Sequence, residues 1–140
     1  MSTPVQETLV LVKPDGVARN LSGEILRRIE QKGYSLVDIK LVQADRSLLA
    51  EHYAEHAGKP FFEPLVEFME SGPILAIRIA GERVIEGFRS LAGTTDPTTA
   101  APGTIRGDLG RDWGSKVQQN LVHGSDSPES ASRELALWFD

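Results

Sequence analysis

The chain has 140 residues, the length of a single domain, and its 40% hydrophobic and 25% charged residues are typical of folded globular proteins. It contains no cysteine, which excludes disulfides, thiolate metal sites and cysteine nucleophiles. Its net charge of −5 offers no basic footprint, so we expect no nucleic-acid partner. The sequence has no apolar run of membrane-spanning length and no N-terminal signal pattern, so we expect a cytoplasmic protein without a membrane partner.

Strands and helices alternate in the first half of the chain. Periodicity and turn residues predict a strand over 7–13, a turn over 14–16, a helix over 22–31, a strand over 34–43 and helices over 47–57 and 61–70. Ser22 and Ser47 are placed to cap the helices that they begin. Val37, Ile39 and Leu41 alternate with polar residues, so we expect one face of their strand to be buried.

The second half of the chain contains a long segment without periodicity. A strand over 74–80 and a helix over 84–91 precede it, and a strand over 117–122 and a helix over 128–138, capped by Ser127, follow it. The segment itself, 93–114, is rich in Gly, Pro and Thr, and a loop of this length in a compact domain is usually functional. Four short strands with helices between them predict an α+β fold of ferredoxin-like type, an antiparallel four-stranded sheet with helices packed on it.

His123 stands at the most informative position of the sequence. It follows a predicted strand, and Gly124 and three small polar residues then lead into the last helix. Gly124 allows close approach to the backbone, and the start of a helix offers free N–H groups and a positive dipole end, which suit an anion beside an imidazole. The alternative is a histidine that is only hydrogen-bonded within an ordinary strand-to-helix turn.

Glu134 lies beside the apolar stripe of the last helix. If its carboxylate is buried, it needs a hydrogen-bond partner, which Ser125 or His123 could supply. A pair of Glu134 and His123 would fix the tautomer of the imidazole and raise its basicity, as in other activated nucleophiles. The alternative is a partly exposed glutamate whose stem lies on the edge of the core.

Cationic and hydroxyl side chains around the long loop suit a polyphosphate. Arg89 precedes the loop and Thr95 and Arg106 lie within it, and arginine offers a fork of donors that fits phosphate. Lys13 ends the first strand and points either into a site at the strand ends or out to solvent. The alternative for the arginines is an ordinary place on the surface. The sequence has no P-loop or dinucleotide-binding glycine motif, so a nucleotide would be held in another way.

His52 and His56 belong to an H-x-x-E-H pattern, which some zinc peptidases share. A catalytic zinc ion needs three protein ligands, and the sequence places no third one. We therefore do not favour zinc-dependent hydrolysis.

Together these segments resemble the nucleoside diphosphate kinase family over nearly the whole chain. The family signature, Asn-x-x-His-Gly-Ser-Asp and a small residue, stands at 120–127 without a mismatch, and family-like segments stand in order at 8–16, 59–62, 71–73 and 102–108. The resemblance implies one kinase domain over 1–140. It also implies ping-pong transfer of the γ-phosphate of a nucleoside triphosphate (ATP) to a nucleoside diphosphate, through a phosphohistidine on His123 and with broad base specificity.

The resemblance implies a role for each candidate residue. Lys13 would meet the phosphates and the ribose, Tyr53 would assist at the γ-phosphate, and Ser125 and Glu134 would orient His123. The nucleotide would be held by Lys13, Phe61, Arg89, Thr95, Arg106 and Asn120, with the ring of Phe61 stacked on the base. The alternative for Phe61 is packing in the core at the start of its helix, and the alternative for Tyr53 is plain helix packing beside Leu49.

The resemblance also implies Mg²⁺ as cofactor, reached by Asp126 through water, and nucleoside di- and triphosphates as partners. Family members are usually hexamers, with some bacterial tetramers, so we expect a homo-oligomer and prefer the hexamer. The stretch 109–119 is a few residues longer than is usual in the family, which leaves its path and a contact of Val117 with the base open. A nucleotide-binding module without turnover is the second hypothesis, but binding alone does not need a nucleophile.

Overall fold

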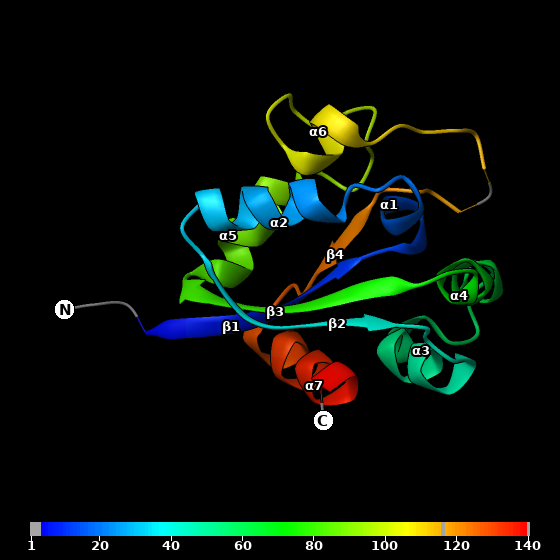
Figure 1. Ribbon diagram of the computed structural model, residues 1–140. Helices are drawn as coiled ribbons and strands as arrows, with labels where there is room; N and C mark the ends of the chain where they lie inside the picture. The colour runs from blue at the N-terminus through cyan, green and yellow to red at the C-terminus, as the bar shows by residue number, and fades with distance from the viewer. Residues whose placement is uncertain (1–3, 116, 140) are drawn as a thin grey trace.

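The computed structural model describes residues 4–115 and 117–139. Its centre is a four-stranded antiparallel sheet in which the strand order is β2-β3-β1-β4 (Figure 1). The strands are β1 (Val5–Val12), β2 (Ser35–Val42), β3 (Ile74–Glu82) and β4 (Val122–Gly124). The α+β fold of ferredoxin-like type that the sequence predicts is confirmed.

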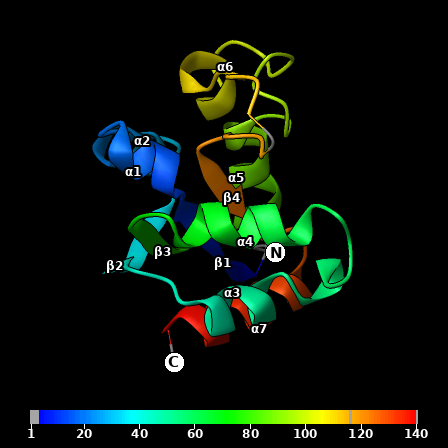
Figure 2. The ribbon, with the colours of Figure 1, turned by 90° about the vertical axis from the view of Figure 1, so that its right-hand side faces the viewer.

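Helices cover both faces of the sheet. They are α1 (Pro14–Ala18), α2 (Ser22–Gln31), α3 (Arg46–His52), α4 (Phe62–Glu70), α5 (Val84–Ala92), α6 (Ile105–Leu109) and α7 (Pro128–Phe139), with a 3₁₀ turn, η1, at Ala54–His56. Helices α2 and α5 lie on one side of the sheet and α3 and α7 on the other, as both views show (Figures 1 and 2). Within the described part of the chain, no helix combines the length and the apolar character that crossing a membrane requires.

The central strand β1 is buried on both faces because helices lie on both sides of it. Val10 and Val12 pack with α2 and α5, whereas Leu9 and Leu11 pack with α3, α4 and α7. All four side chains are fully buried, and each such burial contributes about 1.5–3 kcal/mol to stability. The strand is thereby fixed between two apolar clusters, and Lys13 follows directly after its C-terminal end.

The prediction that one face of the strand over 34–43 is buried is wrong. Val37, Ile39 and Leu41 of β2 are 49%, 40% and 65% exposed. β2 lies at the edge of the described sheet, and the two apolar clusters are centred on β1 and β3 instead. Alternation in sequence shows that a strand has two faces, but it does not show whether anything covers them.

Two short helices stand where the sequence predicts a turn or an open loop. Pro14 begins α1, because its fixed φ and missing N–H are compatible with the first helical position. Helix α6 interrupts the segment 93–114, and the Thr104 hydroxyl caps it by accepting a hydrogen bond from the Gly107 N–H over 2.9 Å. The strand predicted over 117–122 forms later, as β4, where it pairs with β1.

The helix ends differ from the predictions in detail. Asp45, rather than Ser47, caps α3, and Ser22 is the first residue of α2 rather than its cap. Ser127 does cap α7, since its hydroxyl accepts a hydrogen bond from the N–H of the third helical residue over 3.1 Å. The helix predicted over 47–57 stops short, and the chain continues into η1.

Candidate active site

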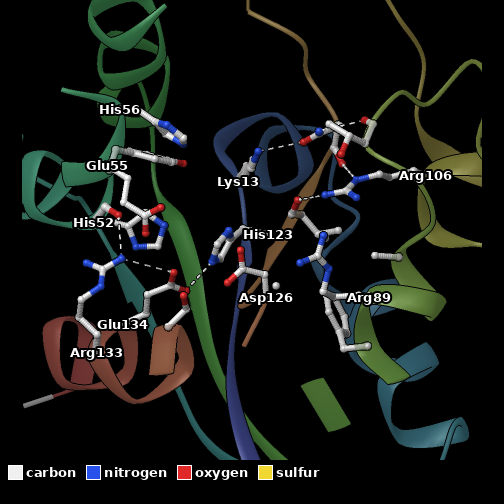
Figure 3. Close-up of a pocket in the computed structure, with 18 residues that line it drawn as sticks. Lys13, His52, Glu55, His56, Arg89, Arg106, His123, Asp126, Arg133 and Glu134 are labelled. Carbon is white, nitrogen blue, oxygen red and sulfur yellow. Dashed lines mark hydrogen bonds and ion pairs between the residues drawn. The ribbon is translucent and has the colours of Figure 1, made fainter. Parts of the chain in front are cut away.

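A pocket of about 370 Å³ opens between α5 and β4 on one side and α3, η1 and α7 on the other (Figure 3). Most of the predicted site residues line it: Lys13, Tyr53, Arg89, Thr95, Arg106, Asn120, His123, Asp126 and Glu134. Of the two others, Ser125 is fully buried beside the pocket and Phe61 is about half exposed at the start of α4. The fold therefore gathers side chains from distant parts of the sequence around His123.

Glu134 on α7 contacts both residues expected to hold it. The His123 Nε2 lies 2.7 Å from the Glu134 Oε1, and the Ser125 hydroxyl donates to the same oxygen over 2.7 Å. The Glu134 side chain is 7% exposed, so the alternative of a partly exposed glutamate is wrong. A buried carboxylate with two hydrogen-bond donors is satisfied, and it holds the imidazole in one orientation.

The contact with Glu134 sets the tautomer of His123. Burial alone would raise the pKa of the Glu134 carboxyl, but hydrogen bonds from His123 and Ser125 and the nearby His52 bring this pKa below its ordinary value. The carboxylate is therefore ionised near neutral pH and accepts the hydrogen that His123 carries on Nε2. The Nδ1 of His123 keeps its lone pair, in a ring that lines the pocket.

A strained turn immediately before β4 is fixed by Asp15. Leu121 has a φ of +73°, and the Val122 N–H donates to the Asn120 carbonyl over 2.8 Å, which makes a γ-turn of the rare, strained form. Asp15 Oδ2 accepts a hydrogen bond from the Leu121 N–H over 3.1 Å, and the Lys13 N–H donates to the Leu121 carbonyl over 2.8 Å. These bonds on both sides of the turn hold Asn120 and the start of β4 in place.

Lys13 points into the site rather than out to solvent. Its Nζ donates to Asn120 Oδ1 over 2.9 Å, and Asn120 Nδ2 donates to the Thr95 carbonyl over 3.0 Å. Burial and the charge of Arg106 lower the pKa of Lys13 to about 8, against the opposing effect of Asp15. An anionic ligand would therefore be attracted to this ammonium group and would stabilise its charged form.

Arg106 uses three of its N–H groups for backbone carbonyls and lines the pocket with the rest of its guanidinium. Its Nε and Nη2 donate to the carbonyls of Asn120 and Val122 over 3.1 and 2.7 Å, and its Nη1 donates to the Gly93 carbonyl over 2.9 Å. A guanidinium has five N–H groups, and these bonds use three, which leaves two for a ligand. Burial and the charge of Arg89 lower the pKa of Arg106 to about 10, so Arg106 remains charged at neutral pH.

The two aromatic candidates both lie near His56, and only Tyr53 lines the pocket. Tyr53 stands between the rings of His52 and His56, with centroid distances of 4.6 and 6.1 Å. Burial and the charge of Glu134 raise the pKa of Tyr53, so its hydroxyl stays protonated and can donate a hydrogen bond. Phe61 is 48% exposed, and its ring lies 5.1 Å from that of His56, so the alternative of a core position for Phe61 is wrong.

Comparison with known proteins shows the family of the chain. A family model described as nucleoside diphosphate kinase matches residues 6–140. The chain belongs to the nucleoside diphosphate kinase family. A nucleoside diphosphate kinase of Streptomyces avermitilis is 58% identical over 135 residues, which are 96% of this chain and 96% of the relative. One from Saccharomyces cerevisiae is 55% identical over 139 residues, 99% of this chain and 88% of the relative.

Solved structures of the family share the fold closely. A halophilic nucleoside diphosphate kinase from Halobacterium salinarum, in complex with CDP, has a TM-score of 0.91 and 47% identity, covering 98% of this chain and 89% of that one. A nucleoside diphosphate kinase family protein from Babesia bovis has a TM-score of 0.88 and 45% identity, covering 96% of this chain and 88% of that one. Membership in the nucleoside diphosphate kinase family makes the chain a phosphotransferase.

One wall of the pocket in this nucleoside diphosphate kinase family member carries residues that the sequence analysis did not place there. They are His52, Glu55, His56 and Arg133, as Figure 3 shows. The two histidines do not share a helix, because α3 ends at His52 and η1 carries His56. The spacing of the two histidines in the sequence indicates only a zinc pattern, whereas the position of Arg133 directly before Glu134 is a signal that could have placed it in the pocket.

Proposed function

We propose that the chain transfers the γ-phosphate of ATP to a nucleoside diphosphate by a ping-pong route through a phosphohistidine on His123. The observation that carries this proposal is the bond between His123 Nε2 and Glu134, because it leaves Nδ1 as a free nucleophile in the pocket. Lys13, Arg89 and Arg106 line the same pocket and supply the positive charge that a polyphosphate requires.

The reaction needs two balanced half-reactions. In the first, the His123 Nδ1 forms a bond to the γ-phosphorus while the bond from that phosphorus to the bridging oxygen breaks, and the nucleoside diphosphate leaves with the electron pair. Glu134 stabilises the positive charge that develops on the ring. In the second, a terminal oxygen of another diphosphate forms a bond to the phosphorus while the bond from phosphorus to the His123 Nδ1 breaks, and the electron pair returns to Nδ1. Phosphoryl transfer depends mainly on positioning and charge neutralisation, which this pocket provides.

For the nucleotide itself, each contact is proposed from the position of a side chain in the pocket. Arg89, Thr95 and Arg106 hold the β- and γ-phosphates, Asn120 and Lys13 meet the ribose and the phosphates, and Tyr53 assists at the γ-phosphate. The half-exposed ring of Phe61 stacks on the base. Every base has a π-face, so stacking suits broad base specificity. The complex of the Halobacterium salinarum relative with CDP supports a nucleotide site in this fold.

Magnesium fits the edge of the pocket at Asp126. This exposed carboxylate lines the pocket and lies beside His123 in Figure 3. Mg²⁺ is usually held by one or two carboxylates together with waters and the phosphates of the substrate, so Asp126 would hold it through water. When bound, the ion would neutralise charge on the phosphates, and Asp126 would hold it through its water ligands.

Labelling with ATP that carries ³²P at the γ-position tests the proposal. The wild-type chain should acquire an acid-labile, alkali-stable label, and a second nucleoside diphosphate should remove it. His123→Ala should remain unlabelled and keep the circular dichroism spectrum of the wild type. A wild-type chain without label overturns the proposal and favours the alternative of a nucleotide-binding module without turnover.

We also propose that the chain assembles as a homo-oligomer in the cytoplasm, a hexamer rather than a tetramer. The edge strand β2 supports self-association, because Val37, Ile39 and Leu41 are exposed there. An exposed, apolar edge strand is a template for pairing with another chain. The preference for six subunits follows from the resemblance to the family alone.

A further inference from the structure

A buried tryptophan donates a hydrogen bond to a histidine beside the nucleophile. Trp138 Nε1 lies 3.0 Å from His52 Nδ1, and the two residues are 1% and 4% exposed. An indole nitrogen can only donate, so the Nδ1 of His52 is the acceptor and carries no hydrogen. In the neutral ring the hydrogen is then on Nε2, on the other side of the imidazole.

His52 also contacts the nucleophile. The ring centroids of His52 and His123 lie 4.7 Å apart with an angle of 72° between the planes, and both rings line the pocket in Figure 3. A ring nitrogen of each histidine and a carboxylate oxygen of Glu134 lie within 4.8 Å of one another. Two imidazoles and a carboxylate form the protein ligands of some catalytic zinc sites. A transition-metal ion bound by these three residues would coordinate both the nucleophile, His123, and the carboxylate of Glu134 that orients His123.

We propose that Trp138 fixes His52 in the tautomer with hydrogen on Nε2 and thereby prevents a metal ion from binding between His52, His123 and Glu134. A neutral imidazole binds a metal through one nitrogen when the other carries the hydrogen, which is usually donated to an acceptor. At His52 these roles are reversed: Trp138 donates a hydrogen bond to Nδ1, so Nδ1 is an acceptor and cannot carry the hydrogen. Binding a metal through Nε2 would set an Nδ1–H group against the indole N–H.

The same contact opposes protonation of His52. An imidazolium carries hydrogen on both nitrogens, so it too would set an N–H against the indole N–H. The titratable groups that face His52 come from β4, α7, the end of β1 and the end of α3: His123, Glu134, Arg133, Lys13 and Tyr53. Burial and the charge of His123 lower the pKa of His52 to about 3, with Glu134 opposing and Arg133 and Lys13 adding to the decrease. Because a neutral His52 carries no positive charge, it does not compete with His123 and Ser125 for the carboxylate of Glu134.

The tautomer can be measured in the wild-type chain. Long-range ¹H–¹⁵N spectra of the chain labelled with ¹⁵N-histidine should show His52 neutral, with hydrogen on Nε2, from about pH 5 to pH 8. Hydrogen on the Nδ1 of His52 overturns the proposal. The inference rests on the proposed function only in naming His123 as the nucleophile. Because these spectra do not involve phosphoryl transfer, they test the inference separately.

Trp138→Phe removes the donor and keeps an aromatic ring. Titration with Co²⁺ should then give visible absorption with one equivalent bound, and His52→Gln in the same variant should abolish it. In excess Mg²⁺, Zn²⁺ should inhibit Trp138→Phe at about tenfold lower concentration than the wild type. Mutating a residue that hydrogen-bonds to a metal ligand changes the affinity for the metal by about 10- to 100-fold. Trp113→Phe is the matched control, because Trp113 is 54% exposed and should behave as the wild type.

Two results of the titration overturn the proposal. One is Co²⁺ binding by the wild type with the same affinity as by Trp138→Phe. The other is a folded Trp138→Phe variant that binds no Co²⁺. Neither result depends on whether the chain is phosphorylated, so each leaves the proposed function to its own labelling test.

Discussion

The role of Glu134 in orienting His123 can be tested without changing His123 itself. Glu134→Gln keeps the size of the side chain but removes the charge that fixes the tautomer of His123. A hydrogen bond to a charged group contributes about 1.5–3 kcal/mol, so the rate of phosphorylation of His123 should fall about 10- to 100-fold in rapid-quench single turnovers. Glu129→Gln changes an exposed carboxylate on the same helix and should leave this rate unchanged. Equal rates in Glu134→Gln and the wild type would contradict the orienting role.

Lys13 is expected to make nucleotide binding sensitive to alkaline pH. Its pKa is lowered to about 8, so the ammonium charge is lost as the pH rises through that value, and the attraction to phosphate is lost with it. Calorimetry should show the Kd for ADP rising between about pH 7 and pH 9.5, although bound phosphate shifts the change to higher pH. Lys13→Gln should bind more weakly with a flatter profile. Lys32→Gln, at the exposed end of α2, should keep the wild-type profile, and a flat profile in the wild type would refute the assignment.

At the scale of single residues, contacts between neighbours in the sequence were predictable and contacts that depend on the path of a loop were not. Glu134 lies 11 residues beyond His123, across a capped helix start, so their contact followed from the local pattern. The three carbonyls that Arg106 binds belong to segments that only the folded loop brings together. The expected roles of these residues toward a nucleotide remain predictions.

At the scale of elements, Asp15 on α1 is expected to stabilise the γ-turn before β4. Asp15→Ala leaves the Leu121 N–H without its acceptor in a fully buried position. An unsatisfied buried donor costs about 1–3 kcal/mol, so urea unfolding should show a loss of this size. Asp112→Ala removes a carboxylate that accepts the Gly114 N–H at an exposed loop, and its effect should stay within about 0.5 kcal/mol. Equal effects of the two variants would show that the turn does not need Asp15.

Strong periodicity and clear caps predicted the long helices and strands, whereas tertiary packing determined whether the short segments form helices or turns. Helix α2 and strand β3 appear where their apolar spacing predicted them, and Ser127 caps α7 as expected. Helices α1 and α6 have five residues each, too few for a periodic pattern, and packing determines whether such segments become turns or helices. The exposure of β2 was also unpredictable, because the sequence of one chain does not show which strand lies at the edge.

At the scale of the whole molecule, the exposed face of β2 predicts how the subunits associate. Burying an apolar side chain contributes about 1.5–3 kcal/mol, and exposed Ile39 and Leu41 are available for such burial in a second copy. The double variant Ile39→Lys, Leu41→Lys places two charges per subunit on this edge, and charged edge strands oppose pairing. Sedimentation velocity should therefore show a smaller assembly than that of the wild type. Val5→Lys changes another exposed apolar residue, away from β2, and should keep the wild-type assembly. If the wild type sediments as a monomer, or if the double variant keeps the full assembly, the contact through β2 does not exist.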